Sequence, residues 1–154
     1  MDMPIDTIEM ILRLGSAAVL AGIIGIDREL RRKTMGLRTF MLISTGTALF
    51  TLLGVELAIA YGDGVTGGAF VDPTRVLQGI TAGIGLIAMG GVLHRDDRVR
   101  GATTGASVWV VGAIGAACGL GLYPHAATAT AIAVGILVLL ALAERVMHRR
   151  IRGE

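Results

Sequence analysis

The sequence predicts an all-α integral membrane protein, a glycine-rich bundle of five transmembrane helices that occupies residues 1–154 as a single domain. Two compositional observations support this fold class. The chain has a mean hydropathy of +0.71, and only 17% of its residues are charged, whereas about a quarter are charged in a typical soluble domain. The third observation is a set of five apolar segments, each long enough to cross a hydrocarbon core of roughly 30 Å as a helix.

These five segments are expected to be helices because every backbone polar group within a bilayer must bond inside its own segment. The strands of a membrane barrel would show shorter runs with alternating hydrophobicity. The predicted helices are Ile5–Ile26, Thr39–Ala60, Thr74–Leu93, Ala102–Leu122 and His125–Ala143.

The basic residues predict how the bundle is oriented. Three places hold twelve (five, three and four) of the 14 Lys and Arg residues: the first loop with the start of the second helix, the third loop, and the C-terminal segment. The loop 61–72 and the turn 121–124 hold none. Under the positive-inside rule, the N-terminus lies outside and the C-terminus lies in the cytoplasm. The arginines therefore mark membrane sidedness and do not indicate nucleic-acid binding.

Small residues at four-residue spacing predict how the helices pack, because close backbone approach drives helix association in lipid. Such pairs are concentrated in the third and fourth helices, which are therefore expected to lie at the centre, with the fifth at the periphery. Gly83, Gly85 and Gly90 are interpreted as packing surface of the third helix. Gly83→Leu is expected to disrupt the bundle.

Ionisable residues within the predicted spans gather near the outer end. A charge inside a span costs at least about 2.5–3.5 kcal/mol on insertion scales, so these residues are the default functional candidates. Glu9 and Arg13 lie four residues apart on one helical face and can pair. The complete predicted outer cluster is Glu9, Arg13, Glu56, Asp72, Arg75 and Gln78.

This outer cluster has two interpretations. In the structural one, Asp72 before Pro73 caps the third helix, and Glu9 and Arg13 neutralise each other. In the functional one, the carboxylates bind or sense an extracytoplasmic cation, and Mg²⁺ is a candidate because hard divalent ions prefer oxygen ligands. The sequence predicts no other metal site and no cofactor.

An enzyme is not expected. No nucleophile–base pair lies at one membrane depth, no loop has the pattern that cradles phosphates, and the three histidines fall at different levels.

Several motifs resemble those of a known family. They are Gly25-Ile26-Asp27-Arg28-Glu29, Met35-Gly36-Leu37-Arg38-Thr39, Asp72-Pro73-Thr74-Arg75, the run 82–90 and the run 99–109. In this order and with this spacing, they resemble the transmembrane domain of the MgtC/SapB family of bacterial inner-membrane proteins, over roughly residues 14–123. The resemblance places family-motif residues in the cytoplasmic loops: Asp27, Arg28, Glu29, Gly36, Arg38, Thr39, Arg100, Gly101, Thr103 and Thr104.

The chain also departs from the family pattern. Asp27 replaces a glutamate, and the third-helix run has gained Ala82, Leu86, Ala88 and Met89, which alters a packing face. Many family members carry a cytoplasmic ACT-like domain after the last helix, and this chain is expected to lack it.

The resemblance implies a bacterial inner-membrane protein tied to magnesium limitation and, in pathogens, to virulence. It also implies restraint of the membrane ATP synthase rather than magnesium transport. The leading hypothesis is therefore a non-enzymatic regulator of magnesium or energy homeostasis that contacts a larger membrane complex, and a homo-oligomer is possible. The alternative is a cation transporter or channel component that uses Glu9, Glu56 and Asp72 as ligands.

Overall fold

A computed structural model of the chain describes residues 5–61, 72–95 and 98–152. The elements are α1 (Thr7–Leu30), α2 (Leu37–Tyr61), α3 (Pro73–Gly90), β1 (Leu93–Arg95), β2 (Arg98–Arg100), α4 (Ala102–Gly119) and α5 (Tyr123–Arg152).

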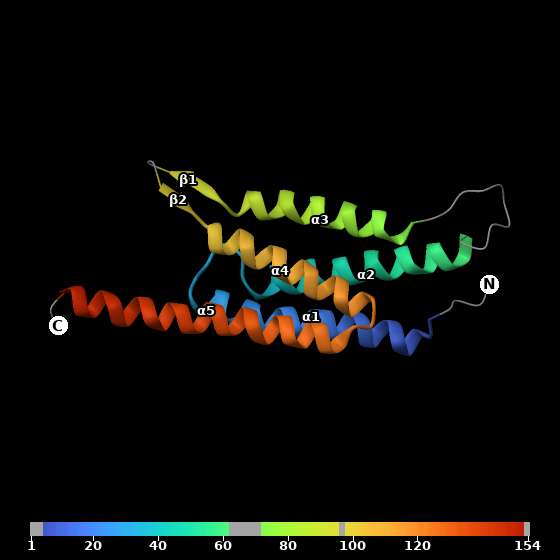
Figure 1. Ribbon diagram of the computed structural model, residues 1–154, viewed down its shortest axis with the longest axis horizontal. Coiled ribbons are helices and arrows are strands. Elements are labelled where there is room, and N and C mark those ends of the chain that lie inside the picture. The colour runs from blue at the N-terminus through green and yellow to red at the C-terminus, as the bar shows by residue number, and fades with distance from the viewer. Residues whose placement is uncertain (1–4, 62–71, 96–97, 153–154) are drawn as a thin grey trace.

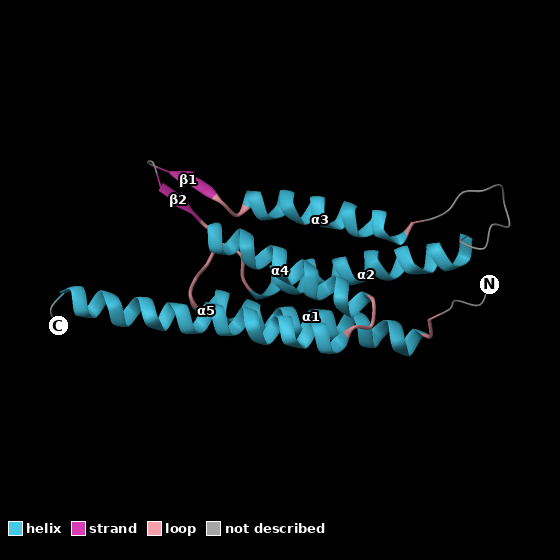
Figure 2. Ribbon diagram, in the orientation of Figure 1, coloured by secondary structure: helices cyan, strands magenta, loops and turns pink. Residues whose placement is uncertain are grey.

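The helices lie lengthwise beside one another and alternate in direction (Figure 1). At one end of the bundle α1 and α3 finish, while α2 and α4 begin; we call this the Arg28 end. At the opposite end α1, α3 and α5 begin, while α2 and α4 finish; we call this the Arg13 end. Figure 2 shows that helix dominates the described residues and that the strands form one small hairpin at the Arg28 end.

Four of the described helices are long and apolar enough to span a membrane: Thr7–Leu30, Leu37–Ala60, Ala102–Gly119 and Tyr123–Leu142. The predicted all-helical membrane bundle is confirmed to this extent. The remaining helix, α3, falls outside this group because its 18 residues include Pro73, Arg75 and Gln78. Large apolar side chains are exposed along the bundle, among them Leu42 at 74% and Leu86 at 73%, as expected where lipid is the solvent.

The hairpin β1–β2 was not predicted from the sequence, which favoured a helix as far as Leu93. The helix instead ends at Gly90, and Leu93 then pairs with Arg100 in an antiparallel ladder. Gly101 makes the turn into α4 with a φ of 91°, a conformation that L side chains rarely adopt. The other boundaries differ from the prediction by a few residues, except that α5 continues to Arg152.

The first helix is longer than predicted, because it continues past Ile26 to Leu30. An ion pair of 2.7 Å between Arg31 Nε and Asp27 Oδ1 joins adjacent turns at this point, and such i,i+4 pairs favour helix. Asp27, Arg28 and Glu29 therefore lie in α1, and their prediction as loop residues was wrong.

The most enclosed helix is α4, which agrees with its predicted central position. Ten of its 18 residues are buried. A Cβ on Gly115 would meet the backbone carbonyl of Ser44, and one on Gly119 would lie 2.5 Å from the carbonyl oxygen of Ala48. The absent side chains thus let α4 lie directly against the backbone of α2.

The predicted central position of α3 was wrong. Nothing lies within 4 Å of a Cβ built on Gly79, Gly83, Gly85 or Gly90, so these glycines do not pack within the described part of the chain. The face that α3 turns to the bundle carries instead Ile84 and Ala88, both buried. Glycine spacing identifies a stripe that permits close approach, but it does not specify which surface the stripe faces.

Candidate functional site

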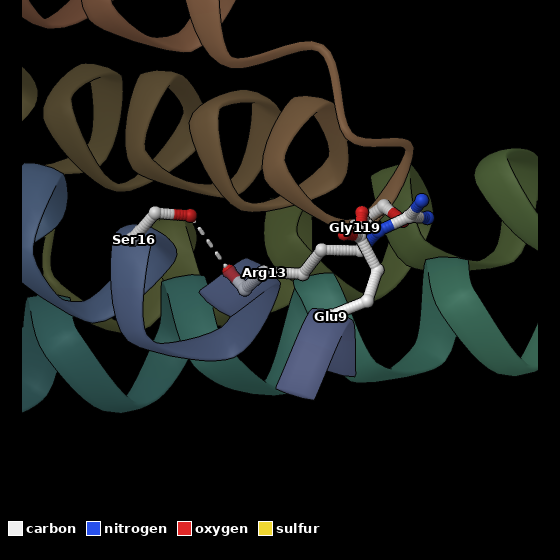
Figure 3. A network of polar contacts seen from close by, with 4 residues as sticks. All are labelled: Glu9, Arg13, Ser16 and Gly119. Atoms are coloured by element: carbon white, nitrogen blue, oxygen red, sulfur yellow. Dashed lines mark hydrogen bonds and ion pairs between the residues drawn. The ribbon is translucent and has the colours of Figure 1, made fainter. Parts of the chain in front are cut away.

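At the Arg13 end, one guanidinium joins two helices (Figure 3). Arg13 Nε donates to Glu9 Oε1 at 2.9 Å, and Nη1 donates to the carbonyl oxygen of Gly119 at 2.8 Å. The Arg13 side chain is 17% exposed and that of Glu9 is 41% exposed. The predicted pairing of Glu9 with Arg13 is present in the structure.

The second contact of Arg13 adds a role that the sequence did not predict. Gly119 is the last residue of α4, and the last four carbonyls of a helix have no partner within it. The C-terminal end of a helix also carries a partial negative charge that favours a cation. Arg13 therefore caps α4 from α1, while Glu9 balances its charge.

The other residues of the predicted outer cluster do not join this pair. Among the described residues, Glu56 is half-buried near the end of α2 with no hydrogen bond or ion pair, and Arg75 and Gln78 are exposed on α3. No group of three or more His, Cys, Asp or Glu side chains in the described ranges is placed to hold a metal ion. Cation sensing at this end stays a prediction.

Asp72 is the N-cap of α3. Its Oδ1 accepts hydrogen bonds from the Thr74 backbone N–H at 2.9 Å and from the Thr74 hydroxyl at 2.7 Å. These donors favour the ionised carboxylate and lower the pKa of Asp72 below its ordinary value. The capping interpretation of Asp72 matches this geometry.

This cap predicts a pH-dependent effect. Because the folded pKa lies below the unfolded one, the stabilisation is present above the unfolded pKa and disappears as the pH falls through the folded pKa. Asp72→Ala should therefore lower the thermal midpoint at pH 7, and the difference from wild type should shrink as the pH falls below about 4. Melting curves from pH 3 to 8 test this, with Asp72→Asn as the uncharged cap; a constant difference would contradict it.

At the Arg28 end, a charged side chain is enclosed in the core. Arg28 is 2% exposed, and its Nη2 donates to the hydroxyl of Thr104 in the first turn of α4. Its Nε has no partner within the described residues. The sequence singled out Arg28 and Thr104 separately as motif residues, but it did not predict their contact.

The neighbouring motif residues build the corner between α1 and α2. Glu29 Oε2 accepts from the backbone N–H of Leu37 at 3.1 Å, at the start of α2. A Cβ on Gly36 would collide with the Glu29 carboxylate, and a Cβ on Gly25 would lie 2.7 Å from Leu37 Cα. These glycines leave room for a tight corner between α1 and α2. The Glu29 carboxylate binds the first free backbone N–H of α2.

Three of the remaining predicted motif residues lie around this corner without polar side-chain contacts in the described residues. Arg38 is exposed and Thr39 half-buried on α2, while Thr103 is exposed on α4. Arg100 lies in β2, and its side chain is outside the described side chains.

A groove of about 610 Å³ runs between α2 and α3 on the surface of the bundle. Its lining is mainly apolar and includes Phe50 and Ile87. Gly46, Gly79 and Gly83 also line it, and each has open space where a Cβ would be. The groove can therefore accept the backbone of another helix at close range.

Comparison with known proteins identifies the family. The MgtC family model matches residues 14–146. This range begins one residue after Arg13 and includes the Arg28 corner and the groove. The chain belongs to the MgtC family. Together with its apolar helices, this membership makes it a multi-pass membrane protein.

Curated relatives of this MgtC-family chain are similar to it over about three quarters of its length. It is 38% identical over 118 residues to the "Putative magnesium transporter YhiD" of Escherichia coli K12, covering 76% of this chain and 54% of that protein. It is 37% identical over 114 residues to "Protein MgtC" of Brucella abortus strain 2308, covering 74% of this chain and 44% of that protein. The chain thus spans about half the length of these relatives. No solved structure matches it significantly.

Proposed function

We propose that this MgtC-family chain is a non-enzymatic regulator of magnesium or energy homeostasis in the bacterial inner membrane. It acts by helix–helix contact with a larger membrane complex, for which the ATP synthase is the candidate. The N-terminus faces outward and the C-terminus faces the cytoplasm, as the basic loops predict.

The observation that carries this proposal is the groove between α2 and α3. In lipid, a stripe of small residues is useful where another helix approaches closely. Gly79 and Gly83 form such a stripe, yet a Cβ at either position would meet nothing within 4 Å in the described protomer. Helices α1, α2 and α4 pack by this device against one another, as Gly25 and Gly115 show, so the same device on α3 favours an external partner.

Site-specific photocrosslinking in membranes tests the proposal. A crosslinking residue at Gly83, in the groove, should capture a specific membrane protein other than the chain itself. The matched position is Ile136, which is 54% exposed on α5 and should not capture that protein. Capture of this chain alone would indicate a homo-oligomer and would contradict the proposal.

A filled groove should abolish the contact without unfolding the protomer. Contrary to the expectation from the sequence, Gly83→Leu should leave the bundle intact, because it places a side chain in open space. The variant should remain monodisperse and should lose most of the partner recovered by co-purification. Partner recovery equal to wild type would show that the groove is not the contact surface.

The second candidate function is cation transport, which is favoured by the name of the Escherichia coli relative. In this proposal Glu9, Glu56 and Asp72 supply oxygen ligands at the outer side. Conduction needs polar groups along the whole path, and Mg²⁺ flux into proteoliposomes that is lost in Glu56→Gln would support it. Absence of Mg²⁺ flux with the wild-type chain would exclude cation transport as its function.

A further inference from the structure

The Arg28 end contains a buried cation that forms no ion pair within the described residues. Arg28 is 2% exposed, and the polar contact described for its guanidinium is with the neutral hydroxyl of Thr104. The nearby carboxylate of Asp27 is bonded to Arg31 at 2.7 Å, and that of Glu29 accepts from Leu37 N–H. Burying an unpaired charge is costly, so buried charges are normally paired.

The guanidinium lies beside the first turn of α4, where the backbone also favours an anion. Thr104 is in the first turn of α4, whose N-cap Gly101 provides no side-chain cap. Gly101 has a left-handed backbone and is followed directly by the right-handed residues of the helix. Successive N–H groups in such a left–right arrangement form an anion-binding concavity, and the N-terminal end of a helix carries a partial positive charge.

Two sources of positive potential thus meet at one place. The Arg28 Nε–H has no partner in the described part of the chain, and the N-cap residue Gly101 offers no side-chain acceptor to the first-turn N–H groups of α4. A guanidinium beside a helix N-terminus is unfavourable when nothing else is present, because both are positive. An anion between them would convert this repulsion into two attractions.

The position of this corner indicates which anion. It lies at the end of the spanning helix α1, and the loop that follows carries the exposed Arg32 and Lys33. The end of a span lies at the depth of the lipid headgroups, where phosphate is the abundant anion and basic residues concentrate it. Phosphate also matches the fork of donors on a guanidinium.

We propose that the Arg28 end binds a phosphate group, held by the Arg28 guanidinium and the N-terminal N–H groups of α4. The phosphate belongs either to an anionic phospholipid or to a free phosphate from the aqueous side. The site is independent of the groove between α2 and α3, so it can exist whether or not a partner protein binds there.

Thermal unfolding of the whole purified chain tests this site. In detergent free of lipid phosphate, inorganic phosphate is titrated against chloride at matched ionic strength. In a second arm, phosphatidylglycerol is added in place of inorganic phosphate, with an uncharged diacylglycerol as its control. A rise of the thermal midpoint on the order of 3 °C at saturation in either arm supports the site, and the responding arm identifies the source of the phosphate.

Arg28→Gln separates binding from structure. Glutamine retains a polar side chain that can bond to Thr104, but it removes the charge and Nε–H. The variant should fold, should be at least as stable as wild type without phosphate, and should lose the rise in midpoint. Arg38→Gln, which removes an exposed charge on the same end, should keep it.

Two results would overturn the proposal. One is a wild-type midpoint that neither phosphate source raises above its control, a result that does not depend on whether Arg28→Gln folds. The other is an equal rise in Arg28→Gln and wild type, which would assign the effect to surface charge.

Discussion

Gly115→Leu is expected to prevent assembly of the bundle. A Cβ at this position would meet the backbone carbonyl of Ser44 on α2, and backbone cannot rotate away as a flexible side chain can. Ser44 lies on the buried face of α2, with Ala48 and Leu52 buried one and two turns further along. Overpacking a dense interior costs about 1–3 kcal/mol or more, and separation of α2 from α4 would remove much of the core.

The matched control for this variant is the same substitution at Gly83. Both glycines lie within helices and both changes add one leucine side chain, but Gly83 has nothing within 4 Å. Size-exclusion profiles and thermal midpoints in detergent should show loss of the monodisperse species for Gly115→Leu and near-wild-type behaviour for Gly83→Leu. Equal behaviour of the two variants would contradict the arrangement of α2, α3 and α4 described above.

Arg13→Leu should produce the second large effect, a destabilisation of about 2–3 kcal/mol. The substitution leaves the Glu9 carboxylate without its partner and the Gly119 carbonyl without the donor that caps α4. Because the Arg13 side chain is only 17% exposed, water cannot fully replace these bonds. Chemical or thermal unfolding in detergent measures the loss.

Variants of the pair distinguish the two contacts. Glu9→Gln should cost less, below about 1 kcal/mol, because Glu9 is 41% exposed and glutamine can still accept the bond. Arg13→Lys should be intermediate, since an ammonium lacks the fork that reaches both acceptors. If Arg13→Leu melts at the wild-type temperature, Arg13 does not hold the end of α4.

The Arg28 end and the Arg13 end differ in what sequence spacing could predict. Glu9 and Arg13 are four residues apart on one helix, so their pairing follows from helical geometry. Arg28 and Thr104 are 76 residues apart, and their contact depends on which faces of α1 and α4 meet. The cap on Gly119 joins residues even further apart in sequence, at 106 residues from Arg13, and no local rule indicates it.

The sequence by itself determined the properties that depend on local composition. Long apolar segments specified helices in a membrane, Asp72 before Pro73 specified a helix start, and ordered motifs indicated the family. These features are local because hydropathy, helix capping and backbone hydrogen bonding within a segment act over a few turns.

The tertiary structure alone decided which glycines pack. Gly115 and Gly83 look alike in sequence, yet one is pressed against the backbone of Ser44 and the other opens onto the groove. The reason is that a small residue permits close approach without selecting a partner. Helix α3 turns its Ile84 side to α4, and that choice of face left the Gly79–Gly83 stripe outside.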